Sequence, residues 1–299
     1  MRLDEFDPNA IDIEDQRGSG GRSGGGLGGF PLGMLLDGRM GLGTIVLIVI
    51  FALVFKVNPV QLLGRAGNVG GTLPGQTQAV AGKSAAESCT IDASSREACN
   101  ALSSLNKTWG PILKNSGIAN ERPGLVFYAQ NGRSGCGEAQ SAMGPFYCPS
   151  DSKIYLDTDF FRQMDQELGA GGQFARDYVI AHEYGHHIQN LMGTSEKVHR
   201  LEQSDPGQAN AQSVRLELQA DCYAGAWAGL NRDRIEPGDI ESGLKAAHQI
   251  GDDTLMKSAG RTPVEAAFTH GSSAQRMKWL RRGIDAASLS DCDTFDEKP

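Results

Sequence analysis

Apolar residues recur with a helical period over most of the chain after residue 88. They fall at positions i, i+3, i+4 and i+7, a spacing that is typical of amphipathic helices. Helices are predicted at residues 89–113, 158–168, 174–192, 207–231, 237–249 and 272–287. The helix at 174–192 stops before Gly193, and a glycine is a common C-terminal signal of a helix.

Three short segments in the same region favour strands, because they are rich in aromatic and β-branched residues. They cover residues 125–128, 145–148 and 154–156. Glycine-rich residues 132–137 predict a turn between the first two strands, and residues 149–151 predict a turn between the second and the third. The pattern as a whole predicts an α+β domain that is mostly helical and contains a small β-sheet.

The longest apolar stretch without a charge covers residues 40–55. As a helix it would be about 24 Å long, somewhat less than the hydrocarbon core of a bilayer at about 30 Å. Lys56 can extend its ammonium group to the membrane surface and make up part of the difference. We predict one transmembrane helix here, and a buried core helix is the alternative.

The composition of the remaining residues predicts how the chain is divided into segments. Residues 1–17 are acidic and polar, and the following residues are crowded with glycine, a composition typical of disorder. The residues after the apolar stretch are rich in Gly, Pro, Gln, Ala and Ser, as in linkers. The predicted organisation is a disordered tail at 1–39, a transmembrane anchor at 40–57, a linker at 58–87 and a folded domain at 88–299.

All six cysteines follow the predicted anchor, and none of them forms a C-x-x-C pair. An even set of cysteines on one side of a membrane segment indicates disulfides in an oxidising compartment. Fifteen pairings are possible. The pairing that we expect is Cys89–Cys99, Cys136–Cys148 and Cys222–Cys292, and six reduced cysteines packed as small apolar side chains are the alternative.

Charge adds two limits. The formal net charge of −8 argues against nucleic acid as a partner, since phosphate binding needs a basic surface. Positive residues are equally divided between the two flanks of the predicted anchor, so they leave its orientation undecided. The localisation is therefore inferred from the cysteines. We expect a single-pass protein of the cell membrane whose folded domain is periplasmic or otherwise extracytoplasmic.

A motif in the helix at 174–192 indicates metal chemistry. His182, Glu183 and His186 form the pattern H-E-x-x-H, in which the two histidines are four residues apart. Such residues share one face of a helix, so both imidazoles can bind one Zn²⁺. Glu183 would then lie beside a water on the metal and take its proton. His187 points about 100° away and is interpreted as a non-ligand.

The next long helix offers a third ligand. A catalytic zinc has three protein ligands and one open position. Glu217 and Asp221 are again four residues apart, in the helix predicted at 207–231. Glu217 can complete a His₂Glu set, and Asp221 can accept the N–H of a ligand histidine and fix its tautomer. An acidic stripe on a solvated helix is the alternative, but apolar residues at helical spacing around the pair indicate that this helix packs.

Four stretches of the chain resemble one bacterial family. They are H-E-Y-G-H-H-I-Q-N, E-L-Q-A-D, I-G-D-D and F-T-H-G-S-S-A-Q-R. They are similar to those of the "putative neutral zinc metallopeptidase" family, whose members are mostly uncharacterised and membrane-anchored, and the resemblance covers most of the chain. It implies a zincin-like fold and a gluzincin-like site, with Zn²⁺ on His182, His186 and Glu217 and with Glu183 as the general base.

The same resemblance implies two further site residues. Gluzincins often add a histidine after the third ligand to stabilise the oxyanion, and their membrane branch has an arginine six residues after it. His270 and Arg276 match that spacing. The resemblance therefore implies a membrane-anchored zinc endopeptidase that acts on a peptide or protein substrate. The alternative from another class is a catalytically silent, zinc-containing membrane protein that serves in binding or as a scaffold.

Overall fold

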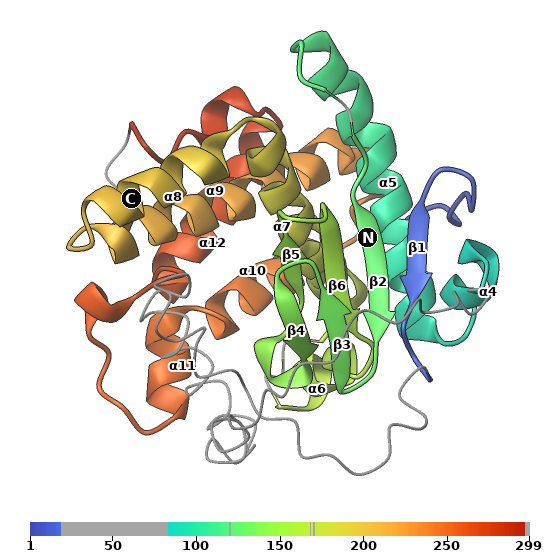
Figure 1. The fold of residues 1–299 in the computed structure, drawn as a ribbon, viewed down its shortest axis with the longest axis horizontal. Coiled ribbons are helices and arrows are strands. Elements are labelled where there is room, and N and C mark those ends of the chain that lie inside the picture. The colour runs from blue at the N-terminus through green and yellow to red at the C-terminus, as the bar shows by residue number, and fades with distance from the viewer. Residues whose placement is uncertain (19–82, 120, 168, 170, 297–299) are drawn as a thin grey trace, which may run out of the picture.

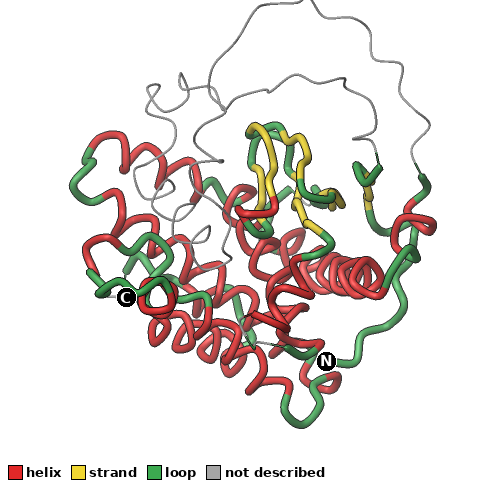
Figure 2. Tube along the Cα trace, turned by 90° about the horizontal axis from the view of Figure 1, so that it is seen from below, coloured by secondary structure: helices red, strands yellow, loops and turns green. Residues whose placement is uncertain are grey.

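The computed structural model describes residues 1–18, 83–119, 121–167, 169 and 171–296. Among these residues the chain forms an α+β fold in which the strands gather on one side of a helical bundle (Figures 1 and 2). The α+β class and its predominance of helices are as predicted.

The main sheet has four strands in the order β1-β2-β6-β5. Their bounds are Asp12–Asp15 for β1, Gly124–Tyr128 for β2, Phe146–Cys148 for β5 and Lys153–Asp157 for β6. β2 pairs in parallel with both β1 and β6, whereas β5 runs antiparallel along β6 at one edge. The residues of β2 are all buried, which explains its continuous apolar sequence. The three predicted strands are confirmed.

A second, two-stranded sheet was missed. β3 (Asn131–Ser134) and β4 (Gly137–Gln140) pair as a hairpin where the sequence predicted only a turn. Glycines within strands weaken the sequence signal, because they have little strand propensity. Here Gly132 approaches Tyr128 so closely that an added Cβ would lie 2.9 Å from the tyrosine Cβ.

All six helices predicted after residue 88 are present. The corresponding elements are α5 (Ala93–Asn115), α6 (Phe160–Glu167), α7 (Gln173–Leu191), α9 (Ala209–Leu230), α10 (Asp239–Gln249) and α12 (Ser273–Ala286). The sequence did not predict α4 (Ala85–Cys89), α8 (Thr194–Ser204) or α11 (Asp252–Ser258). Asp92 separates α4 from α5, because its carboxylate accepts the N–H of Ser95 and caps the longer helix.

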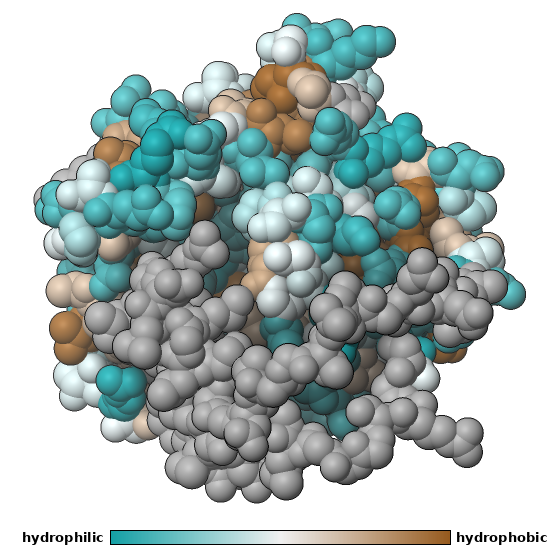
Figure 3. Space-filling view, in the orientation of Figure 1, coloured by the Kyte–Doolittle hydropathy of each residue, from teal (hydrophilic) through white to brown (hydrophobic). Residues whose placement is uncertain are grey.

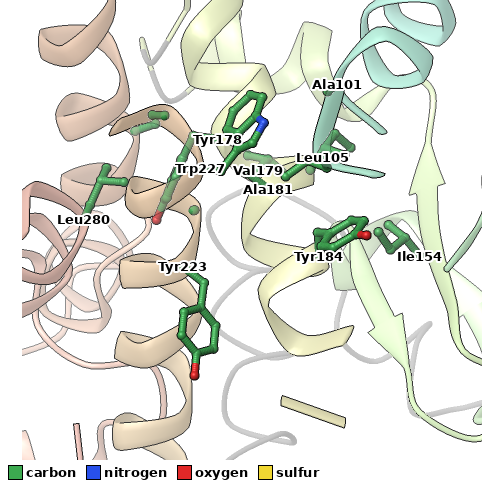
Figure 4. Close-up of a cluster of buried hydrophobic side chains, with 14 of the residues drawn as sticks. Ala101, Leu105, Ile154, Tyr178, Val179, Ala181, Tyr184, Tyr223, Trp227 and Leu280 are labelled. Atoms are coloured by element: carbon green, nitrogen blue, oxygen red, sulfur yellow. The ribbon is translucent and has the colours of Figure 1, made fainter. Parts of the chain in front are cut away.

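Helix α7 runs through the centre of the domain and packs against α5, α9, α10 and strands of the main sheet. Figure 4 shows its side chains between Trp227 of α9 on one side and Leu105 of α5 on the other. At Gly185 an added Cβ would lie 2.9 Å from the Cα of Ala220, so α7 and α9 touch almost backbone to backbone. This close packing brings the acidic pair of α9 to the histidines of α7.

The N-terminal residues correct one sequence prediction. Residues 1–17 are not a disordered tail: they form strand β1 and bury Met1, Phe6 and Ile11 against the domain. The last residues of the linker predicted at 58–87 are also helical, since α4 begins at Ala85. Acidic composition failed as a guide because the order of this segment comes from partners roughly a hundred residues or more away, which local composition does not reveal.

The predicted transmembrane anchor at 40–57 and most of the linker at 58–87 lie outside the described residues. Among the helices that the structure does describe, none combines the length and the apolar character needed to span a bilayer.

The predicted disulfide pairing is confirmed. Cys89–Cys99 joins α4 to α5, Cys136–Cys148 joins the hairpin to β5, and Cys222–Cys292 joins α9 to the C-terminal segment. The six cysteines are thus all paired, and none is a free thiol.

The three bridges are expected to contribute unequally to stability. Constraint of the unfolded chain grows with loop length, so Cys222–Cys292, with a separation of 70 residues, should contribute about 4 kcal/mol and the other two about 3 kcal/mol each in the chain-entropy model. Thermal unfolding of the C222A/C292A and C89A/C99A double variants measures the order. Equal or reversed losses would contradict it.

Candidate metal centre

Three predicted ligands meet where α7 faces α9. One nitrogen each of His182 and His186 and one oxygen of Glu217 all lie within 4.8 Å of one another. The distance from His182 Nε2 to Glu217 Oε2 is 3.1 Å, and from His186 Nε2 to Glu217 Oε1 it is 3.4 Å. The helical spacing within the motif and the close α7–α9 packing together account for this geometry.

These distances are compatible with zinc. Tetrahedral Zn²⁺ with bonds of about 2.0–2.1 Å to nitrogen and oxygen places neighbouring donor atoms about 3.3 Å apart. The separations of 3.1 and 3.4 Å, one to each oxygen of Glu217, are close to that value. His₂Glu is also a donor set of catalytic zinc sites, and it leaves the fourth tetrahedral position to water or substrate.

Asp221 holds His182 in position. Its Oδ1 lies 2.8 Å from His182 Nδ1, and because a carboxylate only accepts hydrogen bonds, Nδ1 carries the proton. Nε2, which lies 3.1 Å from Glu217 Oε2, is then the ring nitrogen left to bind a metal. Although burial alone would raise the pKa of Asp221, the charges of Arg276 and His182 lower it to about 2. Asp221 therefore stays ionised and keeps the tautomer that metal binding needs.

Arg276 lies behind this pair. Its Nε donates to Asp221 Oδ2 and its Nη2 to Asp221 Oδ1, both at 2.8 Å, and Tyr178 Oη donates to the same Oδ1 at 2.5 Å. The arginine is buried. This geometry favours support of Asp221 as the role of Arg276.

Sequence reasoning missed the residue that orients His186. Gln189 Oε1 lies 2.9 Å from His186 Nδ1, while Gln189 Nε2 donates to the carbonyl oxygen of Leu216 at 2.7 Å and to Gln219 Oε1 at 3.2 Å. The acceptor at Nδ1 directs His186 Nε2 to the carboxylate of Glu217. Its role could have been predicted from its position in the sequence, because Gln189 follows His186 by three residues and lies on the same helical face.

Glu183 is buried between α7 and the edge strand β5. The backbone N–H of Tyr147 in β5 donates to its carboxylate, and burial raises the pKa of Glu183 to about 7. Glu183 is not one of the three residues that share the metal position. It is thus a carboxylate held beside the donor set and able to exchange a proton near neutral pH.

His187 is not one of the described residues that share the metal position. It is buried, with Nδ1 3.1 Å from Tyr147 Oη and Nε2 2.6 Å from the carbonyl oxygen of Glu121. Asn190 also donates to Tyr147 Oη, at 3.0 Å. These contacts fasten β5 to α7 above the metal position.

His270 approaches the site from the loop before α12, and Asp252 arranges that loop. Asp252 Oδ2 accepts the backbone N–H groups of Thr269, His270 and Gly271 at 2.7, 2.8 and 3.2 Å. Its Oδ1 lies 3.5 Å from His270 Nδ1. Burial alone would lower the pKa of His270, but the nearby carboxylates of Glu217 and Asp252 raise it. The sequence alone assigned no role to Asp252.

Comparison with known proteins supports the same family. The family model "Putative neutral zinc metallopeptidase" matches residues 5–295. YpfJ of Escherichia coli K12, described as an uncharacterized protein, is 38% identical over 287 residues, which are 95% of each chain. Mb2605 of Mycobacterium bovis, also uncharacterized, is 42% identical over 206 residues, which are 64% of this chain and 67% of the relative. No solved structure matches. The chain belongs to the family described as "putative neutral zinc metallopeptidase".

Proposed function

We propose that this protein is a zinc-dependent endopeptidase of gluzincin type. The observation that carries the proposal is the buried carboxylate of Glu183 beside a donor set to which the described residues contribute three ligands. Three protein ligands would leave one position of a tetrahedral zinc open. A structural zinc site is normally closed by four protein ligands and has no use for a base. The geometry therefore favours catalysis over the scaffold alternative.

Each group then has a defined role in peptide hydrolysis. When bound, Zn²⁺ supplies Lewis acidity and lowers the pKa of a coordinated water to about 7. Glu183 accepts the proton of the attacking water and passes it to the nitrogen of the leaving amine. His270 donates a hydrogen bond to the oxyanion that develops on the scissile carbonyl, a contact typically worth about 3–4 kcal/mol.

The edge strand provides a place for the substrate. β5 pairs with β6 on one side only within the described sheet, and its Tyr147 already contacts Glu183. An extended peptide can add to such an edge through backbone hydrogen bonds, which would lay its scissile bond beside the metal position. This mode of binding requires an unfolded segment and is consistent with an endopeptidase.

One experiment separates the two functions. The purified full chain is loaded with one equivalent of Zn²⁺ and incubated with casein as an unstructured substrate. A peptidase will release peptides and lose that activity when a chelator removes the metal. If the protein holds one zinc per chain but releases no more peptide than the same sample treated with a chelator, the scaffold function is favoured.

Asp252 is expected to matter for activity through His270. Asp252→Ala leaves three buried N–H groups without their charged acceptor and should lower the free energy of unfolding by about 1.5–3 kcal/mol. Asp252→Asn keeps an acceptor but removes the charge beside His270, so it should lower kcat with a smaller effect on stability. Asp253→Asn is the control, because Asp253 bonds Ser273 and Lys257 instead. Equal activity of the two asparagine variants would remove Asp252 from this role.

Localisation enters the proposal as well. The uncharged stretch 40–55 supports attachment to a membrane, and three disulfides support an oxidising, extracytoplasmic compartment for the domain.

A further inference from the structure

The first seventeen residues form an arm that crosses the domain from one side to the other. Near its start, the backbone N–H of Arg2 donates to the carbonyl oxygen of Arg234 at 2.8 Å. Farther along, the N–H of Phe6 donates to Asn100 Oδ1 at 3.0 Å, and Asn106 Nδ2 donates to the carbonyl oxygen of Ala10 at 3.0 Å. The arm therefore follows α5 before it reaches the sheet.

The end of the arm is part of the main sheet. β1 pairs in parallel with β2 over four residues, with Asp12 opposite Gly124 and Asp15 opposite Phe127. Figure 1 shows β1 beside β2, at the opposite edge from β5. Strand pairing satisfies backbone groups that would otherwise face solvent or lie buried without a partner. The arm thus belongs to the same folded unit as the metal centre.

The end of the arm meets the chain that begins again at Lys83. Arg17 Nη2 donates to the carbonyl oxygen of Ser88 at 2.9 Å, and Arg17 Nη1 donates to Ser95 Oγ at 2.6 Å. Lys83 Nζ lies 3.1 Å from Asp15 Oδ2. Residues 17 and 83 therefore lie side by side, although 65 residues separate them in the sequence.

This juxtaposition sets a limit on membrane topology. A chain that crosses a bilayer once between residues 18 and 83 would place the arm on one side and the domain on the other. Backbone hydrogen bonds between β1 and β2 cannot form across a hydrocarbon core about 30 Å thick.

We propose that the N-terminal arm and the domain occupy the same side of the membrane, so that the apolar stretch 40–55 does not make a single crossing. The proposal rests on the membrane attachment proposed above. It replaces the single-pass arrangement that the sequence analysis expected. On the face shown in Figure 3, apolar residues of the described part lie in small separate patches. The longest uncharged apolar sequence of the chain is the stretch 40–55. With the domain in an oxidising compartment, the arm is exported with it.

Labelling of single cysteines tests the sidedness. Asn9→Cys reports on the arm and Ser204→Cys on the domain, since both residues are exposed and the native cysteines are all paired. Spheroplasts that express each full-length variant are treated with a membrane-impermeant maleimide before and after lysis. We expect both sites to react to the same extent in intact spheroplasts. Reaction of one site only before lysis, with both sites reacting afterwards, would overturn the proposal.

Two controls keep this result separate from the attachment itself. Carbonate extraction of the unmodified chain, compared with a chain lacking residues 40–55, reports whether the stretch holds the protein in the membrane. Protein released by carbonate would refute the attachment and leave the sidedness result standing. Arg17→Ala should lower Tm by about 4–8 °C if the arm is docked, whereas Arg2→Ala at an exposed position should not. Equal Tm values for the two variants would also overturn the proposal.

Discussion

Replacing Glu183 with glutamine is expected to abolish nearly all peptidase activity while zinc binding remains. The loss should be at least about 10²–10⁴-fold in kcat, the usual contribution of a general base. Glutamine has nearly the shape of glutamate and retains an oxygen that can accept the N–H of Tyr147, so strand β5 should stay in place. It cannot accept a proton from the attacking water.

Zinc content of the purified variants completes this test. Glu183→Gln should hold as much zinc as the unmodified protein, because Glu183 is outside the donor set. His186→Ala should lose both zinc and activity. Glu196→Gln, the same substitution at an exposed glutamate of α8 that pairs with Arg200, is the matched control and should change neither. Full activity of Glu183→Gln would refute the proposed mechanism.

The residues that could be predicted share one property: their geometry is set by helical periodicity. His182, Glu183 and His186 lie within five positions of one helix, so their relative placement follows from the sequence. The same holds for Glu217 and Asp221. The proximity of these two helices did not follow from spacing. It depends on the close approach of Gly185 to Ala220, which only packing reveals.

Residues that support the site from a distance were harder to identify. Asp252 acts on a loop seventeen to nineteen residues farther along the chain, through three backbone N–H groups. Nothing in the side chains of that loop indicates which carboxylate will accept those bonds. Arg276 was assigned by resemblance alone, and only the structure reveals its two bonds to Asp221.

The N-terminal arm was the largest failure of sequence reasoning. Its acidic residues suggested a solvated tail, but Asp15 is buried and bonded to Arg17 and Lys83. The strand that it forms has only four residues, two of them aspartate, and aspartate is rare in strands. Its stability comes from β2, more than a hundred positions away, and no local pattern encodes such a partner.

Replacing the two acidic residues of α9 is expected to have opposite effects: one replacement mainly lowers zinc affinity, and the other mainly lowers the stability of the metal-free protein. Glu217→Ala removes a metal ligand, so zinc affinity should fall by more than about 100-fold, the largest loss usual for a residue that only orients a ligand. Among the described residues its carboxylate pairs with His182 and His186, so the metal-free fold should change little. Asp221→Asn removes the charge behind His182 and should lower zinc affinity by about 10–100-fold.

Stability should show the reverse order. Asp221→Ala would leave the buried guanidinium of Arg276 without its counter-ion, and breaking a buried pair typically costs about 3–5 kcal/mol. Metal titration and thermal unfolding of the metal-free proteins therefore separate the two roles, with Glu241→Ala at an exposed position of α10 as the control. If Asp221→Asn loses more zinc affinity than Glu217→Ala, the third ligand is Asp221. If instead the metal-free Glu217→Ala is the less stable protein, Glu217 contributes to the fold beyond its contacts with the histidines.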